Sequence, residues 1–140
     1  MKKIITYSLL LSIFFLTSCS KDDEIYDETA IIGTWTLSSY FIEGEEMELD
    51  DCDTTSTMNF EENYNYAQHT FQYINDNCTK TYSEIGVWKF LGKNVFTTTP
   101  QEGSTYKFTV GFSGNTYTTE DLIVTNGVKK LHRFTYTKIN

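Results

Sequence analysis

Alanine and proline are nearly absent from this sequence of 140 residues: alanine occurs only at positions 30 and 67, and proline only at position 100. Helices are built largely from Ala, Leu, Glu and Lys, whereas Thr, Tyr, Phe and Val suit a pleated, half-buried surface. The chain has 22 threonines and is 16% aromatic. After residue 32, no stretch has a clear 3.6-residue apolar period. The composition therefore predicts an all-β domain.

Basic residues are also scarce, because 11 Lys and Arg face 19 Asp and Glu, for a net charge of −8. A protein that binds nucleic acid needs a basic face for the phosphates, so we expect no nucleic-acid partner. The length allows one domain. It leaves no room for a (β/α)₈ barrel or for a dinucleotide-binding domain joined to a substrate domain.

Motifs for catalysis and for metal binding are missing. The sequence has no Gly-x-Ser-x-Gly, no His-Glu-x-x-His and no glycine-rich phosphate loop. Asp50, Asp51 and Asp53 lack the glycine and terminal glutamate of a calcium loop, which favours a solvated acidic segment. We therefore expect no enzyme, cofactor or metal site. An enzyme would require His69 or Glu84 to meet another polar group in a cleft.

The N-terminus has the pattern of a secretory signal. Lys2 and Lys3 precede an apolar run at residues 4–16, which as a helix would span roughly 20 Å, short of the ~30 Å of a bilayer core. The following Leu16-Thr17-Ser18-Cys19 resembles the bacterial lipobox. This resemblance implies that residues 1–18 are a removed lipoprotein signal peptide, that Cys19 is diacylated, and that residues 19–32 form an acidic tether. The alternative is an ordinary signal peptide that contains a cysteine.

The segment after the cysteine, residues 20–24 (Ser-Lys-Asp-Asp-Glu), resembles the surface-export signal of Bacteroidetes lipoproteins. That resemblance implies a protein anchored in a bacterial outer membrane by its lipid and displayed on the cell surface. The alternative is the periplasmic leaflet, with the same residues acting as a solvated tether.

Two further cysteines, Cys52 and Cys78, would lie in an oxidising compartment. A disulfide between them would stabilise the fold by ~3 kcal/mol, because it constrains the unfolded chain. A zinc site is the alternative, but His69 and His132 are isolated and no Cys-x-x-Cys is present. We favour the disulfide.

Turn signals recur every eight to twelve residues, and they divide the domain into eight expected strands. The expected strands are 34–42, 54–60, 64–74, 80–91, 95–99, 105–112, 116–124 and 128–138. Short connections predict an eight-stranded antiparallel up-and-down β-barrel, whose closure removes both exposed edges. A seven-stranded sandwich is the rival; it needs a longer crossover and usually a Trp between its two cysteines, which is missing here.

The motif Gly33-Thr34-Trp35, together with Arg133 in the last expected strand, resembles the lipocalin pattern. Gly86-Val87-Trp88 fits a second Gly-x-Trp strand in the small lipocalin-like lipoproteins of Bacteroidetes. The resemblance implies a barrel over residues 33–140, with Trp35 and Trp88 plugging one end and Arg133 packed over the first indole. A meander with these strands places both Trp at one end and both Cys at the other. The chain is shorter than a full lipocalin, so it could enclose only a small cavity.

The resemblance implies a monomer that binds a small apolar or amphipathic molecule. If Trp88 points inward, alternation places Glu84 and Tyr82 on the same inner face. Glu84 could orient the polar head of a ligand or satisfy nearby hydroxyl groups and Arg133. We expect Phe41 to point inward as well. The candidate ligand-binding residues are Leu37, Ser39, Met58, Tyr82, Glu84, Tyr106, Phe108, Leu122 and Leu131. The alternative function is a surface protein-interaction module or an inhibitor without a small-molecule ligand.

Overall fold

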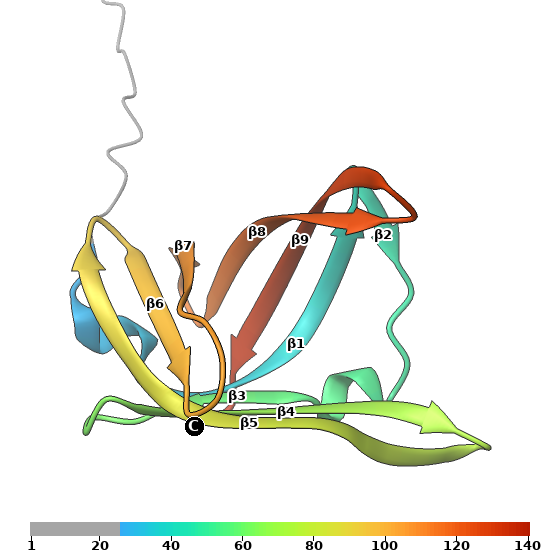
Figure 1. Cartoon of the computed structure of the whole chain (residues 1–140), viewed down its shortest axis with the longest axis horizontal. Coiled ribbons are helices and arrows are strands. Elements are labelled where there is room, and N and C mark those ends of the chain that lie inside the picture. Colours follow the sequence, from blue (N-terminus) through green and yellow to red (C-terminus); the bar gives the residue numbers. More distant parts are fainter. Residues whose placement is uncertain (1–25) are drawn as a thin grey trace, which may run out of the picture.

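The computed structural model describes residues 26–140 (Figure 1). The expected signal peptide, Cys19 and most of the tether lie outside these residues. The strands are β1 (Gly33–Ile42), β2 (Glu45–Met47), β3 (Thr57–Phe60), β4 (Asn65–Ile74), β5 (Asn77–Gly92), β6 (Val95–Pro100), β7 (Tyr106–Ser113), β8 (Thr116–Thr125) and β9 (Val128–Lys138). Two short 3₁₀ helices, η1 (Glu28–Ile31) and η2 (Asp53–Thr55), complete the described elements. No helix among these residues is long and apolar enough to cross a bilayer.

Eight of the strands form a closed antiparallel barrel. Their order is β1-β3-β4-β5-β6-β7-β8-β9, and β9 pairs back with β1 over Trp35–Ile42. This closure confirms the predicted fold class and excludes the two-sheet sandwich. The ninth strand, β2, is a short arm that pairs only with the end of β1 (Figure 1). It lies between the expected strands 34–42 and 54–60, where no strand was predicted.

The disulfide is confirmed, with the Cα atoms of Cys52 and Cys78 5.4 Å apart. Strand β3 starts later than expected, because residues 53–55 form η2 in place of extended chain. The Asp50 side chain explains this turn, since its carboxylate accepts hydrogen bonds of 2.8 Å from the backbone N–H groups of both Cys52 and Asp53. The acidic segment therefore has a local structural role as a turn.

The hairpin turns are explained by residues that tolerate positive φ. Asn126 and Gly127 have φ of 52° and 78°, as a type I′ turn requires at both central positions. In the turn at Asn75 and Asp76, both residues also have positive φ. Both turns lie, with the disulfide, at one end of the barrel, which we call the disulfide end. The opposite end, which holds Trp35 and Trp88, is the tryptophan end.

The hydrophobic core fills the tryptophan end. Its buried members are Ile31, Trp35, Phe60, Tyr66, Trp88, Phe96, Phe108, Val110 and Tyr117. Both indole N–H groups donate to backbone carbonyls, that of Trp35 to Ile31 over 2.7 Å and that of Trp88 to Glu61 over 3.0 Å. Burial of these rings therefore leaves no indole donor without a partner.

The two Gly-x-Trp motifs owe their glycines to close approach. A Cβ on Gly86 would lie 2.2 Å from the carbonyl oxygen of Thr99 and 2.7 Å from the Tyr66 ring. A Cβ on Gly33, whose φ is +133°, would lie 2.5 Å from Cε of Lys138. At each position a side chain larger than hydrogen would collide with the neighbouring strand or side chain, so glycine is required there.

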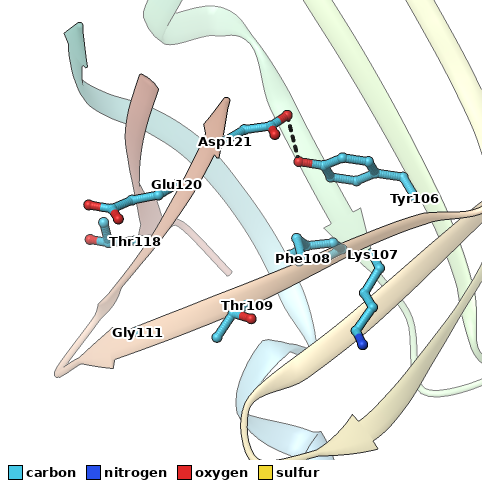
Figure 2. A pocket seen from close by; sticks show the side chains of 8 residues that line it. All are labelled: Tyr106, Lys107, Phe108, Thr109, Gly111, Thr118, Glu120 and Asp121. Carbon is cyan, nitrogen blue, oxygen red and sulfur yellow. Dashed lines mark hydrogen bonds between the residues drawn. The ribbon is translucent and has the colours of Figure 1, made fainter. Parts of the chain in front are cut away.

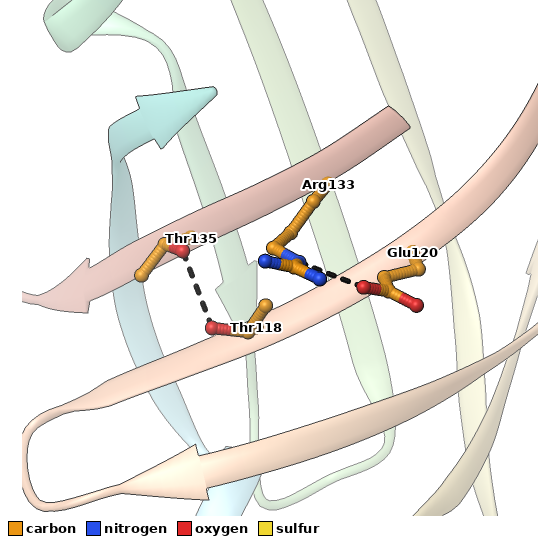
Figure 3. Close-up of polar contacts among 4 residues, drawn as sticks. All are labelled: Thr118, Glu120, Arg133 and Thr135. Carbon is orange, nitrogen blue, oxygen red and sulfur yellow. Dashed lines mark hydrogen bonds and ion pairs between the residues drawn. The ribbon is translucent and has the colours of Figure 1, made fainter. Parts of the chain in front are cut away.

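The residue packed over Trp35 is Lys138, and the prediction of Arg133 was wrong. The Lys138 ammonium lies 5.4 Å from the Trp35 ring centroid, because Lys138 is the direct partner of Trp35 in the β1–β9 register. Arg133 lies farther along β9, opposite Phe41. It points to the outside of the barrel, where its Nε donates to Glu120 over 2.7 Å (Figure 3).

Candidate functional site

A cavity of about 360 Å³ lies inside the barrel, between the core of the tryptophan end and the disulfide end. Phe108 and Tyr117 belong to that core and also line the cavity. Seven of the eight barrel strands contribute to its walls. The eighth, β1, lines a smaller pocket, and β2 takes no part. The lining residues are Met58, Gln68, Glu84, Thr98, Tyr106, Phe108, Tyr117, Thr119, Asp121, Ile123, Phe134 and Tyr136.

Aromatic side chains dominate one wall. Tyr117 and Tyr136 stack with ring centroids 4.7 Å apart, and Trp35 meets Tyr117 edge-on at 4.8 Å. The Tyr117 hydroxyl lies 3.5 Å from the Met58 sulfur. Burial raises the pKa of Tyr117, and it raises the pKa of Tyr136 to about 12. Both phenols therefore stay neutral at physiological pH.

Two carboxylates face this interior, and tyrosine hydroxyls hold both. Tyr66 and Tyr82 donate hydrogen bonds to different oxygens of Glu84. Tyr106 donates to Asp121 over 2.8 Å (Figure 2). Burial and the neighbouring carboxylate raise the pKa of Tyr66, and the same two causes raise the pKa of Tyr106. These phenols thus remain hydrogen-bond donors to the acids.

The wall between β7 and β8 is open along part of its length. These strands pair only from Val110–Thr119 to Ser113–Thr116, so the residues before Val110 and after Thr119 diverge. A surface pocket of about 590 Å³ occupies the gap (Figure 2). It shares Tyr106, Phe108 and Asp121 with the interior cavity. The hydrogen bond between Tyr106 and Asp121 therefore bridges a side opening of the barrel.

A smaller pocket of about 190 Å³ adjoins the cavity beside η2. Leu37 and His69 line it, and it shares Met58, Phe134 and Tyr136 with the larger space. His69 lies 3.0 Å from the Ser83 hydroxyl through its Nδ1. Within residues 26–140 no three His, Cys, Asp or Glu side chains converge as metal ligands do.

The structure divides the nine residues expected at the ligand site. Met58, Glu84, Tyr106 and Phe108 line the cavity, and Leu37 lines the smaller pocket. Tyr82 contacts the site only through its hydrogen bond to Glu84. The remaining three, Ser39, Leu122 and Leu131, do not line the cavity.

Leu122 and Leu131 lie on the outer face, and their prediction as lining residues was wrong. Their side chains are 61% and 37% exposed, and the two residues pair with each other across β8 and β9. The neighbouring Asp121 and Ile123 point inward. Assigning the opposite phase to a strand moves every side chain to the other face. The same one-residue error placed Tyr117, Phe134 and Tyr136 on the outer face, although they line the cavity. Their aromatic side chains could have indicated the inner face.

Ser39 is displaced by a β-bulge, and its assignment was wrong as well. The register of β1 with β9 shifts between Leu37 and Ser39. After this shift, Ser39 pairs with Thr135 and Phe41 with Arg133, both on the outer face. Tyr40 takes the inner position, stacked on Phe134 with centroids 4.9 Å apart. After a bulge, side chains that would point inward point outward, and the reverse. No residue type in this strand indicates where the bulge lies.

Comparison with protein-family models matches residues 31–137 to a lipocalin-like domain. No curated protein matches the chain. The matched range contains both Gly-x-Trp motifs, the disulfide and every residue of the interior cavity.

Proposed function

Because the chain belongs to the lipocalin-like domain family, we propose that it binds a small apolar or amphipathic molecule inside its barrel. The observation that carries this proposal is the cavity of about 360 Å³. Its size lies within the usual range of small-molecule sites, roughly 300–1,000 Å³, and it joins apolar walls to a few polar groups. The proposal assigns no catalytic role to any residue.

The cavity can be tested by filling it. Ile123 points into the cavity, whereas its neighbour Leu122 is 61% exposed on the outer face. We expect Ile123→Trp to weaken binding of an uncharged fluorescent apolar probe such as Nile red at least about tenfold, because the indole occupies the same space. Leu122→Trp is the matched control and should leave the affinity unchanged. Equal affinities for both variants would place the probe elsewhere and count against the proposal.

The natural ligand can be sought directly. Native mass spectrometry of protein purified from its own host should show a mass above that of the polypeptide, and the Ile123→Trp variant should lack it. If the wild-type protein, extracted gently, shows only the mass of the polypeptide, this would argue against stable binding.

We further propose that the protein is a lipid-anchored bacterial envelope lipoprotein. The charged N-terminus, the apolar run and the lipobox-like residues 16–19 support this. Two acyl chains make anchoring effectively stable, at ~0.8 kcal/mol per buried CH₂. Mass spectrometry of the membrane fraction should find Cys19 acylated, and Cys19→Ser should release the protein from the membrane. Protease treatment of intact cells should then distinguish the cell surface from the periplasmic leaflet.

One observation favours a second function, recognition of a protein partner. The outer face of β8 and β9 exposes Leu122, Val124 and Leu131, with 61%, 58% and 37% of each side chain accessible. Adjacent exposed apolar side chains are typical of interaction surfaces. If this function holds, Leu122→Glu should abolish specific cross-links formed at this face in intact cells while retention of the small-molecule probe persists.

A further inference from the structure

We infer that the interior cavity selects an organic cation: an apolar body carrying a protonated amine that pairs with Asp121 and Glu84. This inference rests on the proposed binding function and adds the chemical class of the ligand. It combines the charge of the lining, the neutrality of the groups that already contact the acids, and the aromatic surface beside them.

The charged side chains that line the cavity all have the same sign. Glu84 and Asp121 are the only ionisable groups there besides tyrosines, and the lining contains no Lys, Arg or His among the described residues. The described partners of both acids are phenols, from Tyr66, Tyr82 and Tyr106. A phenol donates one hydrogen bond but brings no positive charge, and an ionised carboxylate can accept several bonds. These partners therefore bring no compensating positive charge to the acids and leave acceptor capacity on their oxygens.

Two of the basic groups near these acids lie outside the cavity, and the third, His132, is buried with its Nε2 unpaired among the described residues. Arg133 is paired with Glu120 on the outside of the barrel (Figure 3). Lys107 lines the surface pocket between β7 and β8 but not the interior cavity (Figure 2). His132 is the partner of Asp121 in the β8–β9 register, and its Nδ1 contacts the Tyr40 hydroxyl. None of the three side chains lines the cavity beside Glu84.

The aromatic wall suits the same ligand. Phe108, Tyr117, Phe134 and Tyr136 line the space with the two acids. Ring faces attract ammonium groups electrostatically, and this attraction is larger where water is excluded. A ligand with its own carboxylate would instead meet like charge at Glu84 and Asp121, which disfavours it. The side opening at Tyr106 and Asp121 allows a cation to reach one acid from the surface.

The inference is tested with three probes of nearly equal shape: phenethylamine, 2-phenylethanol and phenylacetate. Isothermal titration calorimetry of the folded wild-type protein at neutral pH should give the tightest binding for phenethylamine and the weakest for phenylacetate. Asp121→Asn should lower the phenethylamine affinity by about tenfold or more, because the charge-assisted contact is lost. The same variant should change 2-phenylethanol binding little, and Glu84→Gln should act in the same direction.

Glu102→Gln provides the control for net charge. Glu102 is exposed in the segment before β7 and lines no pocket described above, so this variant removes one negative charge away from the cavity. Its phenethylamine affinity should stay near the wild-type value. An equal loss in Glu102→Gln and Asp121→Asn would overturn the inference, because general attraction to an acidic protein would then explain the preference. Denaturation midpoints of the variants identify any loss caused by unfolding.

The outcomes separate this inference from the proposed function. If 2-phenylethanol or phenylacetate binds as tightly as phenethylamine, the cavity binds ligands but does not select cations, and only the inference fails. If none of the three binds and the apolar fluorescent probe also fails, both the inference and the proposed function fail.

Discussion

At the tryptophan end, Trp35 and Trp88 are 2% and 1% exposed and both indole N–H groups have backbone partners. Toward the disulfide end, the inward-facing Ile123 and Phe134 are only partly buried and line the cavity. The same eight strands run through both regions. One end is a packed core, and the other is joined by a covalent bond between Cys52 and Cys78. The comparison indicates that stability comes mainly from one end, which leaves the middle of the barrel free to form a cavity.

Trp35→Ala should have the largest effect among four tests of this comparison. Truncating a fully buried aromatic residue costs about 3–5 kcal/mol of unfolding free energy, and Trp35 also contacts Tyr117 and Lys138. Chemical denaturation measures this cost. Ile123→Ala, at an inward-facing and only partly buried position toward the disulfide end, is the comparison and should cost less. Similar costs at both positions would show that the two ends do not differ as described.

Removal of the disulfide should come second. Cys52→Ala with Cys78→Ala should lower the unfolding free energy by about 3 kcal/mol, because a cross-link with a separation of 26 residues no longer constrains the unfolded chain. Hydrogen exchange should locate the loss of protection in the β4–β5 hairpin and η2 before it reaches the tryptophan end. A reductant should have no effect on this double variant. Uniform loss of protection would contradict a division between the ends.

Gly86→Ala should destabilise the protein by about 1–3 kcal/mol, as forced overpacking does. Its new Cβ would lie 2.2 Å from the Thr99 carbonyl oxygen. Gly111→Ala is a matched control on β7, because its Cβ would meet only the Thr118 oxygen, at 3.9 Å. Thermal denaturation of both variants gives the difference. A neutral Gly86→Ala would mean that the core beside Tyr66 can relax.

The smallest expected difference concerns the two basic residues of β9. Lys138→Ala should cost about 1 kcal/mol, since the ammonium lies over Trp35. Arg133→Ala should cost less than about 0.5 kcal/mol, because its ion pair with Glu120 is roughly half exposed on both sides. Denaturation at low and high salt measures both effects. A larger cost for Arg133→Ala than for Lys138→Ala would favour Arg133, as predicted from the sequence, as the cation that stabilises Trp35.

The site shows where reasoning from the sequence stops. Glu84 was reached by alternation along a strand whose phase Trp88 anchored. Tyr106 and Phe108 lie two positions apart on one strand and therefore share a face. The last two strands contain no tryptophan, and the aromatic residues Phe134 and Tyr136, two positions apart, were not used to set their phase. Arg133 was placed inside by resemblance, and this choice turned Phe134 and Tyr136 outward. In β1 the bulge after Leu37 turns Ser39 to the outer face and places Tyr40 on the inner face.

The sequence alone determined the all-β class, the closed eight-stranded barrel, the disulfide and most of the turns, because each depends on local signals: β-forming composition, paired cysteines, and residues that tolerate positive φ. The tertiary structure decided which cation covers Trp35, which face of β8 and β9 points inward, and that Glu84 and Asp121 share one cavity. These features depend on register between strands distant in the chain. A shift of one residue reverses the face of every side chain while leaving the composition and the turns unchanged.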